Sequence, residues 1–364
     1  MNAEFITALH DLEKEKGIDK EVLIEAIEAA LISGYKRNFN SAQNVRVDVN
    51  RHSGQVRVFA RKNVVEDVLD ARLEISLEAA NEIDPNFRID DIVEIEVTPR
   101  DFGRIAAQTA KQVVTQRIRE AERGLIYNEF IDREEDIVNG IVQRQDSRSY
   151  FVDLGKVEAV MPLTEKMPTD DFKPQDRIKA YIIKVEKTTK GPQIVISRTH
   201  PGLLKRLFEL EVPEIYDGVV EIKSVAREAG DRSKIAVHST NEEVDPVGAC
   251  VGPKGLRVQT IVNELKGEKI DIVRWSEDPA EYVANALSPS KVVHVEVNVE
   301  EKMTRVIVPD YQLSLAIGKR GQNARLAAKL TGWKIDIKSE SQAEQEGISY
   351  PKPSDEEASD VGME

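Results

Sequence analysis

The sequence contains one cysteine, Cys250, among its 364 residues. A single thiol excludes a disulfide framework and a cysteine-rich metal site, and we expect Cys250 to be a small buried apolar residue. No apolar run approaches the roughly 18 residues that a membrane span needs. Residues 1–12 have the pattern of an amphipathic helix with Glu, Asp and Lys, so they lack the apolar centre of a signal peptide. These absences predict a cytoplasmic protein with no membrane segment.

The sequence also lacks an excess of basic residues. It has 51 Lys and Arg against 65 Asp and Glu, a net charge of −14, which argues against a protein that coats nucleic acid non-specifically. Any nucleic-acid site must therefore be local. Residues 318–338 form such a region, because six cations there accompany a single anion, a net charge of +5. Residues 346–364 are rich in Glu and Asp together with Ser, Pro and Gly, and predict an acidic disordered tail.

Catalytic signatures are missing as well. A Gly-x-x-x-x-Gly-Lys-Ser/Thr phosphate loop is absent, because the Gly-Lys pairs at Gly155 and Gly318 are followed by Val157 and Arg320. The five histidines are scattered without the spacing of metal ligands. The carboxylates lie on solvated faces by pattern, so no acid–base pair can be singled out. We expect no catalytic residue, no metal and no cofactor.

What the sequence does contain is one short loop used twice. Gly252-Pro253-Lys254-Gly255 is followed 66 positions later by Gly318-Lys319-Arg320-Gly321. Each loop precedes an amphipathic helix, and each helix is followed by the tetrapeptide Lys-Ile-Asp-Ile, at 269–272 and 334–337. A lone Gly-x-x-Gly would indicate only a turn or the start of a helix. Because the downstream pattern repeats too, the two segments are predicted to be duplicated units.

The two glycines of each loop leave a stretch of backbone without bulky side chains. A sugar-phosphate chain can then approach amide donors at the positive end of a helix. The KH fold, which these segments resemble, holds about four nucleotides of single-stranded nucleic acid in this way. The eight loop residues are therefore candidate RNA clamps. Five neighbours within two turns either contact RNA bases and phosphates or belong to a plain helix surface: Arg257, Gln259, Gln322, Asn323 and Arg325.

Residues 1–130 predict an α/β N-terminal domain. Helices over 3–15 and 19–38 precede a hairpin of alternating strands at 45–49 and 56–59 and a further strand at 92–97. A long helix over about 104–130 keeps the apolar repeat of 3.6 residues. Several cations lie mostly off that repeat, and they either form a solvated helix face or contact a large acidic partner; they include Arg104, Lys111 and Arg117.

Residues 131–200 predict five short strands separated by Gly, Pro and Asp turns. That number of strands in such a short segment suits a small closed barrel. Their order, the Asp-Leu-Gly turn at 153–155 and the ending Gly-Pro-Gln-Ile-Val-Ile-Ser-Arg resemble an OB-fold β-barrel of the S-one type. Tyr150 and Phe151 are adjacent in a strand, so one should point into the barrel and the other outward, where it could stack on a base.

Residues 201–276 and 277–345 predict two related α/β modules. Each has strands, a short helix, the Gly-x-x-Gly loop, a longer helix and a last strand, the bacterial arrangement of the KH fold, known as type II. Only Ser276, Glu277, Asp278 and Pro279 separate the modules. Because so short a linker permits little reorientation, we expect one rigid binding track.

The chain as a whole is thus an α+β multidomain protein, and its domain order resembles the NusA family of bacterial transcription elongation factors. The resemblance covers nearly the whole sequence. Its most specific stretches are residues 101–112, residues 197–201 (Ser-Arg-Thr-His-Pro), residues 228–232 (Glu-Ala-Gly-Asp-Arg) and the two loops. The sequence ends soon after the second module, so regulation through the additional C-terminal acidic repeats of some relatives is not expected.

The resemblance implies a monomeric factor that docks residues 1–130 on core RNA polymerase, with Arg104, Lys111 and Arg117 as candidate contacts. It implies binding of nascent single-stranded RNA, modulation of pausing, intrinsic termination and antitermination, and assembly with other Nus antitermination factors. The KH repeats alone fit a ribosome-associated or RNA-processing factor equally well, because KH and S-one modules also accompany exoribonucleases. Residues 1–125 would distinguish these alternatives through their binding to polymerase.

Overall fold

The computed structural model describes residues 3–38 and 44–350. The chain divides into two compact units, with the boundary between Ile126 and Tyr127. Most of the segment expected to be an acidic tail, residues 351–364, lies outside the described residues. Among those that are described, no helix combines the length and the apolar character needed to cross a membrane.

The N-terminal unit begins with two helices, as predicted. Helix α1 (Ala3–Lys16) is followed by Gly17, whose φ of 66° is the left-handed value that glycine adopts readily. Helix α2 (Lys20–Asn38) follows Asp19, whose Oδ1 accepts a hydrogen bond of 2.7 Å from the Glu21 backbone N–H. A side-chain oxygen that satisfies an amide donor of the first turn is typical of a helix N-cap.

Four strands form the sheet of this unit. The predicted hairpin of β1 (Val45–Val49) and β2 (Val56–Val65) is antiparallel and pairs Val47 with Val58. Strand β4 (Ile92–Glu96) is antiparallel to the far part of β2. Strand β3 (Glu74–Ser76), which is parallel to β2, and helix α3 (Leu77–Ile83) were not predicted.

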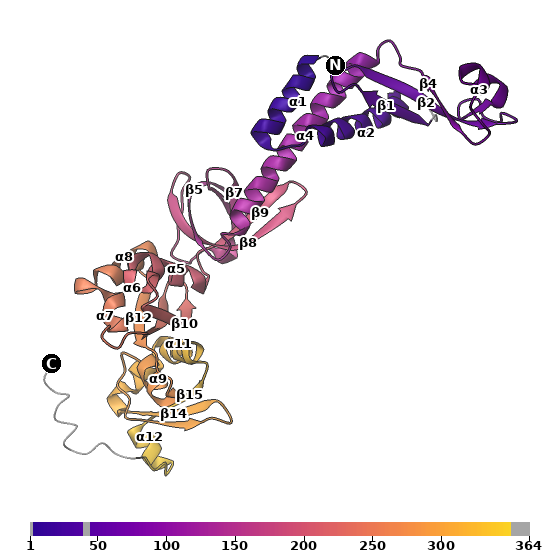
Figure 1. The fold of residues 1–364 in the computed structure, drawn as a ribbon. Helices are drawn as coiled ribbons and strands as arrows, with labels where there is room; N and C mark the ends of the chain where they lie inside the picture. The colour runs from indigo at the N-terminus through magenta and orange to yellow at the C-terminus, as the bar shows by residue number, and fades with distance from the viewer. Residues whose placement is uncertain (1–2, 39–43, 351–364) are drawn as a thin grey trace. The chain divides into compact units, whose positions relative to one another are not determined.

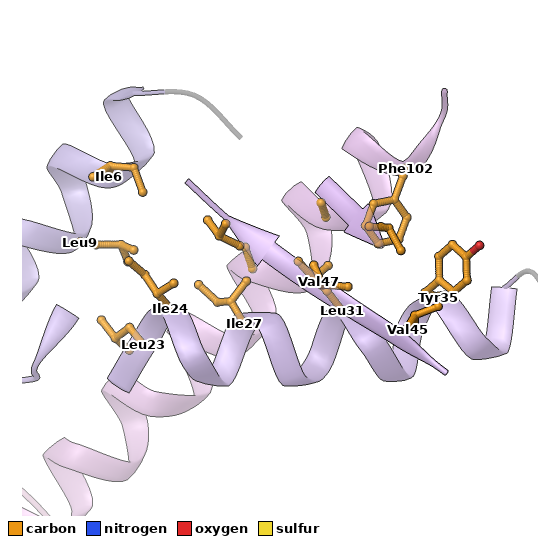
Figure 2. Close-up of a cluster of buried hydrophobic side chains, with 14 residues drawn as sticks. Ile6, Leu9, Leu23, Ile24, Ile27, Leu31, Tyr35, Val45, Val47 and Phe102 are labelled. Atoms are coloured by element: carbon orange, nitrogen blue, oxygen red, sulfur yellow. The ribbon is translucent and has the colours of Figure 1, made fainter. Parts of the chain in front are cut away.

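A hydrophobic core joins the helices to the hairpin. Buried side chains from α1, α2 and β1 converge with Phe102, the first residue of the long helix α4 (Phe102–Ile131) (Figure 2). The alternation predicted for β1 is confirmed, since Val45, Val47 and Val49 are buried and the two residues between them are half-buried. Helix α4 therefore begins inside the core of this unit.

A five-stranded closed barrel begins the second unit (Figure 1). Its strands are β5 (Ile137–Gln145), β6 (Ser149–Asp153), β7 (Glu158–Pro162), β8 (Arg177–Thr188) and β9 (Gly191–Ser197), in the order β5-β6-β7-β9-β8, with β8 paired back to β5. A short 3-10 turn, η1 (Leu163–Glu165), follows β7. The predicted barrel fold is confirmed.

Two α/β modules follow the barrel. The first consists of α5 (Pro201–Glu211), α6 (Pro213–Tyr216), β10 (Val220–Glu228), β11 (Arg232–Ser239), α7 (Pro246–Val251), η2 (Pro253–Gly255), α8 (Leu256–Glu264) and β12 (Lys269–Arg274). The second consists of α9 (Pro279–Ala286), β13 (His294–Asn298), β14 (Met303–Val308), η3 (Asp310–Gln312), α10 (Leu313–Ile317), η4 (Lys319–Gly321), α11 (Gln322–Thr331), β15 (Lys334–Ser339) and α12 (Glu340–Gln345). In both three-stranded sheets the middle strand is antiparallel to the first and parallel to the last.

The two modules share a hydrophobic core. Helix α11 of the second module lies beside β10 of the first (Figure 1). Residues of the first module's sheet, Ala226, Ala236 and Val273, belong to the same buried cluster as Leu326 and Ala327 of α11. Since the modules bury apolar surface against each other, their mutual orientation is set by packing as well as by the short linker.

Candidate nucleic-acid interface

The two Gly-x-x-Gly loops have the same backbone conformation. The first glycines, Gly252 and Gly318, have φ and ψ of 72° and 175° and of 76° and 170°. The third positions, Lys254 and Arg320, both have a φ of 54°. The last glycines, Gly255 and Gly321, both have a φ of 74°. Each loop is closed by one hydrogen bond from its last N–H to the carbonyl of its first glycine, 3.1 Å long in the first loop and 3.0 Å in the second.

The glycines of each loop meet different surroundings. A Cβ at Gly318 would lie 2.8 Å from the backbone nitrogen of Asn323, and one at Gly252 would lie 2.6 Å from Cγ of Arg257. At Gly255 a Cβ would meet no atom within 4 Å. The first glycine thus lets the loop pack tightly on its helix. The last glycine is less confined, since a Cβ at Gly321 would meet only Nη1 of Arg325, at 3.8 Å.

The loops present unpaired cations. Pro253, Lys254, Lys319 and Arg320 are exposed, and within residues 3–38 and 44–350 none of the three cations forms an ion pair. Each loop leads directly into a helix, α8 or α11, whose N-terminus carries a partial positive charge. An exposed backbone beside cations and a helix N-terminus is suited to an anionic chain.

Two of the five predicted neighbours support their loops from inside. Asn323 is only 3% exposed, and its Nδ2 donates to the carbonyls of Leu287 (2.9 Å) and Ala316 (3.1 Å). Arg257 is the equivalent residue of the first loop, and its Nη1 donates to the Ala249 carbonyl at 2.6 Å and to Oε2 of Glu214 at 2.9 Å. The structure therefore gives both side chains partners within the protein, in place of the exposure that the sequence pattern predicted.

Two more neighbours contact the other module. Gln322 Nε2 donates to Oε2 of Glu228 (2.9 Å) and to Oδ2 of Asp231 (2.8 Å). Arg325 Nε donates to Oε1 of Glu228 at 2.7 Å. Gln259, the fifth neighbour, is exposed, and its Nε2 donates to Oδ1 of Asn263 on the same helix at 2.9 Å. Of the five, Gln259 and Arg325 are exposed, and Gln259 is the one whose side chain bonds to neither a loop nor the other module.

The barrel adds an aromatic surface. Tyr150 is 4% exposed and packs edge-on against Phe172 at 6.0 Å between ring centroids. Phe151 is the outward ring, and the guanidinium of Arg144 lies over it at 3.5 Å from the centroid. Phe151 is half-buried, and a base could stack on this pair of ring and guanidinium at the outer side of β6. The sequence predicted one ring on each side of the strand, and the structure shows which.

A buried arginine fastens the barrel to the first module. Arg198 is 1% exposed, its Nε donates to Oδ2 of Asp170 (2.8 Å), and its Nη2 donates to the carbonyl of Glu264 at the end of α8 (3.0 Å). A second buried pair, within the first module, joins Arg227 to Glu268 at 2.9 Å. Sequence reasoning missed both pairs, because no periodicity distinguishes a buried arginine from an exposed one.

The three cations predicted to contact polymerase lie on α4. Arg104, Lys111 and Arg117 are all exposed. Arg117 Nη1 donates to Oε2 of Glu120 at 3.1 Å, one turn further along the helix. Because an exposed pair at this spacing contributes little to stability, all three remain accessible to a partner.

Metal and thiol chemistry have little support in the described parts of the chain. No group of three or more His, Cys, Asp or Glu side chains there could hold a metal ion. Cys250 is fully buried, as predicted, and burial raises the pKa of its thiol to about 12. A thiol with such a high pKa is a poor nucleophile at neutral pH.

Comparison with protein families matches successive parts of the chain to four domains. The NusA N-terminal domain matches residues 4–124, and the S1 RNA binding domain matches residues 131–197. The NusA-like first KH domain matches residues 198–275, and the NusA-like second KH domain matches residues 279–345.

Comparison with individual proteins gives relatives of nearly the same length. The transcription termination/antitermination protein NusA of Halalkalibacterium halodurans is 81% identical over 348 residues, which cover 96% of this chain and 91% of the relative. The protein of the same name from Bacillus subtilis is 73% identical and covers 98% and 96%. That from Thermus thermophilus is 44% identical and covers 92% and 89%.

Proposed function

The chain belongs to the NusA family of transcription termination/antitermination proteins, and we propose that it binds nascent single-stranded RNA and core RNA polymerase during elongation. Through these contacts it modulates pausing, intrinsic termination and antitermination, as a cytoplasmic monomer that also joins other Nus antitermination factors. A ribosome-associated or RNA-processing role is not favoured, because the relatives that align over nearly the whole chain are named for transcription.

The observation that carries RNA binding is the pair of loops with one shared backbone conformation. Both lie at the surface, both lead into a helix, and both carry cations that have no carboxylate partner in the described parts of the chain. We place the phosphate contacts at residues 252–255 and 318–321, with Gln259 as an additional contact. Arg257 and Asn323 act instead as supports of the loops, because their side chains are bonded to backbone carbonyls.

The test of RNA binding reverses the charge of the second loop. Replacing Lys319 and Arg320 with Asp puts anions where phosphate must lie, so the affinity for single-stranded RNA should fall on the order of a hundredfold at low salt. The logarithmic salt slope, expected at about −3 to −6, should become shallower by about 1.4. The matched control replaces Lys266 and Lys269 with Asp, the same change of charge in the segment after α8, and should retain most of the affinity. Equal losses in both variants would refute the assignment.

Polymerase binding is assigned to the exposed cations of α4. Arg104 and Lys111 are seven residues apart, so they lie on one stripe of the helix. Replacing both with Glu should weaken retention on core RNA polymerase about tenfold, the loss of roughly 1.4 kcal/mol. Arg117→Glu should have a smaller effect because Arg117 already pairs with Glu120. The control, Arg119→Glu with Arg123→Glu, changes the net charge by the same amount on another stripe of α4. An equal loss of retention in this control would contradict a specific contact at Arg104 and Lys111.

A further inference from the structure

One guanidinium links the second loop to the first module. Arg325 Nε donates to Oε1 of Glu228 at 2.7 Å, and its Nη1 donates to the backbone carbonyl of Arg320, inside the second Gly-x-x-Gly loop, at 3.1 Å. Glu228 ends strand β10 of the first module. The same side chain therefore contacts the turn of one module and the clamp of the other.

A second side chain strengthens this contact. Gln322, the first residue of α11, donates through Nε2 to both Glu228 and Asp231 at 2.9 and 2.8 Å. Elsewhere along the same boundary, the buried Nζ of Lys234 donates to the carbonyl of Ser288 in the second module at 2.6 Å. The hydrogen bond from Arg325 lowers the pKa of Glu228, so this carboxylate is charged at neutral pH.

The first loop shows that this contact is not needed to form a clamp. The residues equivalent to Gln322 and Arg325 are Leu256, which is 65% exposed, and Gln259, which bonds within its own helix. Nevertheless the φ and ψ values of the first loop agree with those of the second to within a few degrees. The contacts of Gln322 and Arg325 must therefore serve something other than the local conformation of the loop.

We propose that Glu228 and Arg325 are positioning residues that, together with the shared hydrophobic core, hold the two RNA clamps in a fixed mutual arrangement, so that one strand of RNA is bound by both. This inference rests on the proposed RNA binding. Its physical basis is effective concentration: once one clamp holds the RNA, a fixed second clamp meets the same strand at a high local concentration. If the second loop can move relative to the first, part of this gain in effective concentration is lost although each clamp is intact.

The inference predicts a change in the ratio of two affinities. An oligouridine of about four nucleotides fills one clamp, and one of about twelve can reach both. In the full-length protein, Glu228→Gln should lower the ratio of the twelve-nucleotide to the four-nucleotide association constant three- to tenfold. The affinity for the short RNA should not fall, since the variant removes a negative charge near the loop. The removal of a negative charge should raise both association constants, so this electrostatic gain cancels in their ratio. A lower ratio therefore reports a change in the arrangement of the two clamps.

Two further variants make the test specific. Arg325→Lys keeps the positive charge but lacks the planar fork that reaches Glu228 and the Arg320 carbonyl together, so it should lower the ratio as Glu228→Gln does. Glu243→Gln changes the same charge at an exposed carboxylate of the first module and should leave the ratio unchanged. An unaltered ratio in both test variants, or an equal drop in the control, would overturn the inference. Failure of the unmodified protein to bind either RNA would instead overturn the proposed function, and the inference with it.

Discussion

The two KH-like modules have the same loop but different attachments. The first contacts the barrel through Arg198, whose charged group is almost fully buried. The second contacts the first through a shared hydrophobic core and through Arg325, whose side chain is 47% exposed. The loops themselves differ by a few degrees. The comparison shows that the clamp conformation is determined locally by two glycines, while the placement of each clamp depends on side chains distant in sequence.

The contacts of Arg198 and Arg325 should therefore contribute different amounts to the free energy of unfolding. Replacing Arg198 with Met leaves the carboxylate of Asp170 buried without its cation, and an uncompensated buried charge costs about 3–5 kcal/mol. We expect a loss of that size in the unfolding free energy of the barrel and first module, measured by native-state hydrogen exchange.

Two controls bracket this expectation. Arg144→Met removes an exposed cation paired with Glu158 and should cost about 1 kcal/mol or less. Adding Asp170→Asn to Arg198→Met removes the buried charge and should recover part of the loss. A loss below about 1 kcal/mol for Arg198→Met alone would remove the distinction between the two attachments.

The next largest expected effect is the difference in stability lost when the first or the last glycine of a loop is replaced with Ala. Gly318→Ala should destabilise the second module by about 2–3 kcal/mol, because its backbone lies in a region that only glycine readily occupies and a Cβ would meet the Asn323 backbone. Gly255→Ala should cost about 1 kcal/mol, since it suffers only the left-handed strain and meets open space. Chemical denaturation of both variants measures the difference, and equal losses would contradict the tight packing at Gly318.

The smallest effect concerns pH. Glu228 has a lowered pKa in the folded protein, so its contribution is present above its unfolded pKa and is lost as the pH falls through the folded value. The attachment of the second module should weaken only in acid, by less than about 1 kcal/mol because both partners are partly exposed. A carboxyl NMR titration should place the pKa of Glu228 below 4.5 and closer to that value in Arg325→Lys; identical titrations would contradict the contact.

Much of the fold could be predicted because its signals are local. The strict alternation at 45–49, the two helices before it and the five barrel strands all follow from short-range patterns, and the structure has them. The duplicated loops were visible because glycine and the downstream tetrapeptide recur at a nearly constant spacing. Strand β3 and helix α3 were missed because each is short, although Ser76 is a typical N-cap residue and accepts a hydrogen bond from Ala79 N–H.

The environment of individual side chains could not be predicted. Asn323 and Arg325 are two residues apart on one helix, yet one is 3% exposed and the other contacts a different module. Their type and spacing favoured RNA contact equally. Only the fold brings Glu228 and Asp231, more than 90 positions away, to the start of α11. A polar residue next to a Gly-x-x-Gly loop therefore marks the region of the RNA-binding site in the sequence. Which groups its side chain contacts can be seen only in the structure.

Photocrosslinking tests the joint use of the two loops most directly. A single-stranded RNA of about twelve nucleotides, substituted throughout with 4-thiouridine, would be crosslinked to the full-length protein, and the attached peptides identified by mass spectrometry. We expect crosslinks in the peptides that contain residues 252–255 and 318–321, and the loss of the second set in the Lys319→Asp, Arg320→Asp variant. Crosslinks confined to the barrel, with neither loop labelled, would contradict the account.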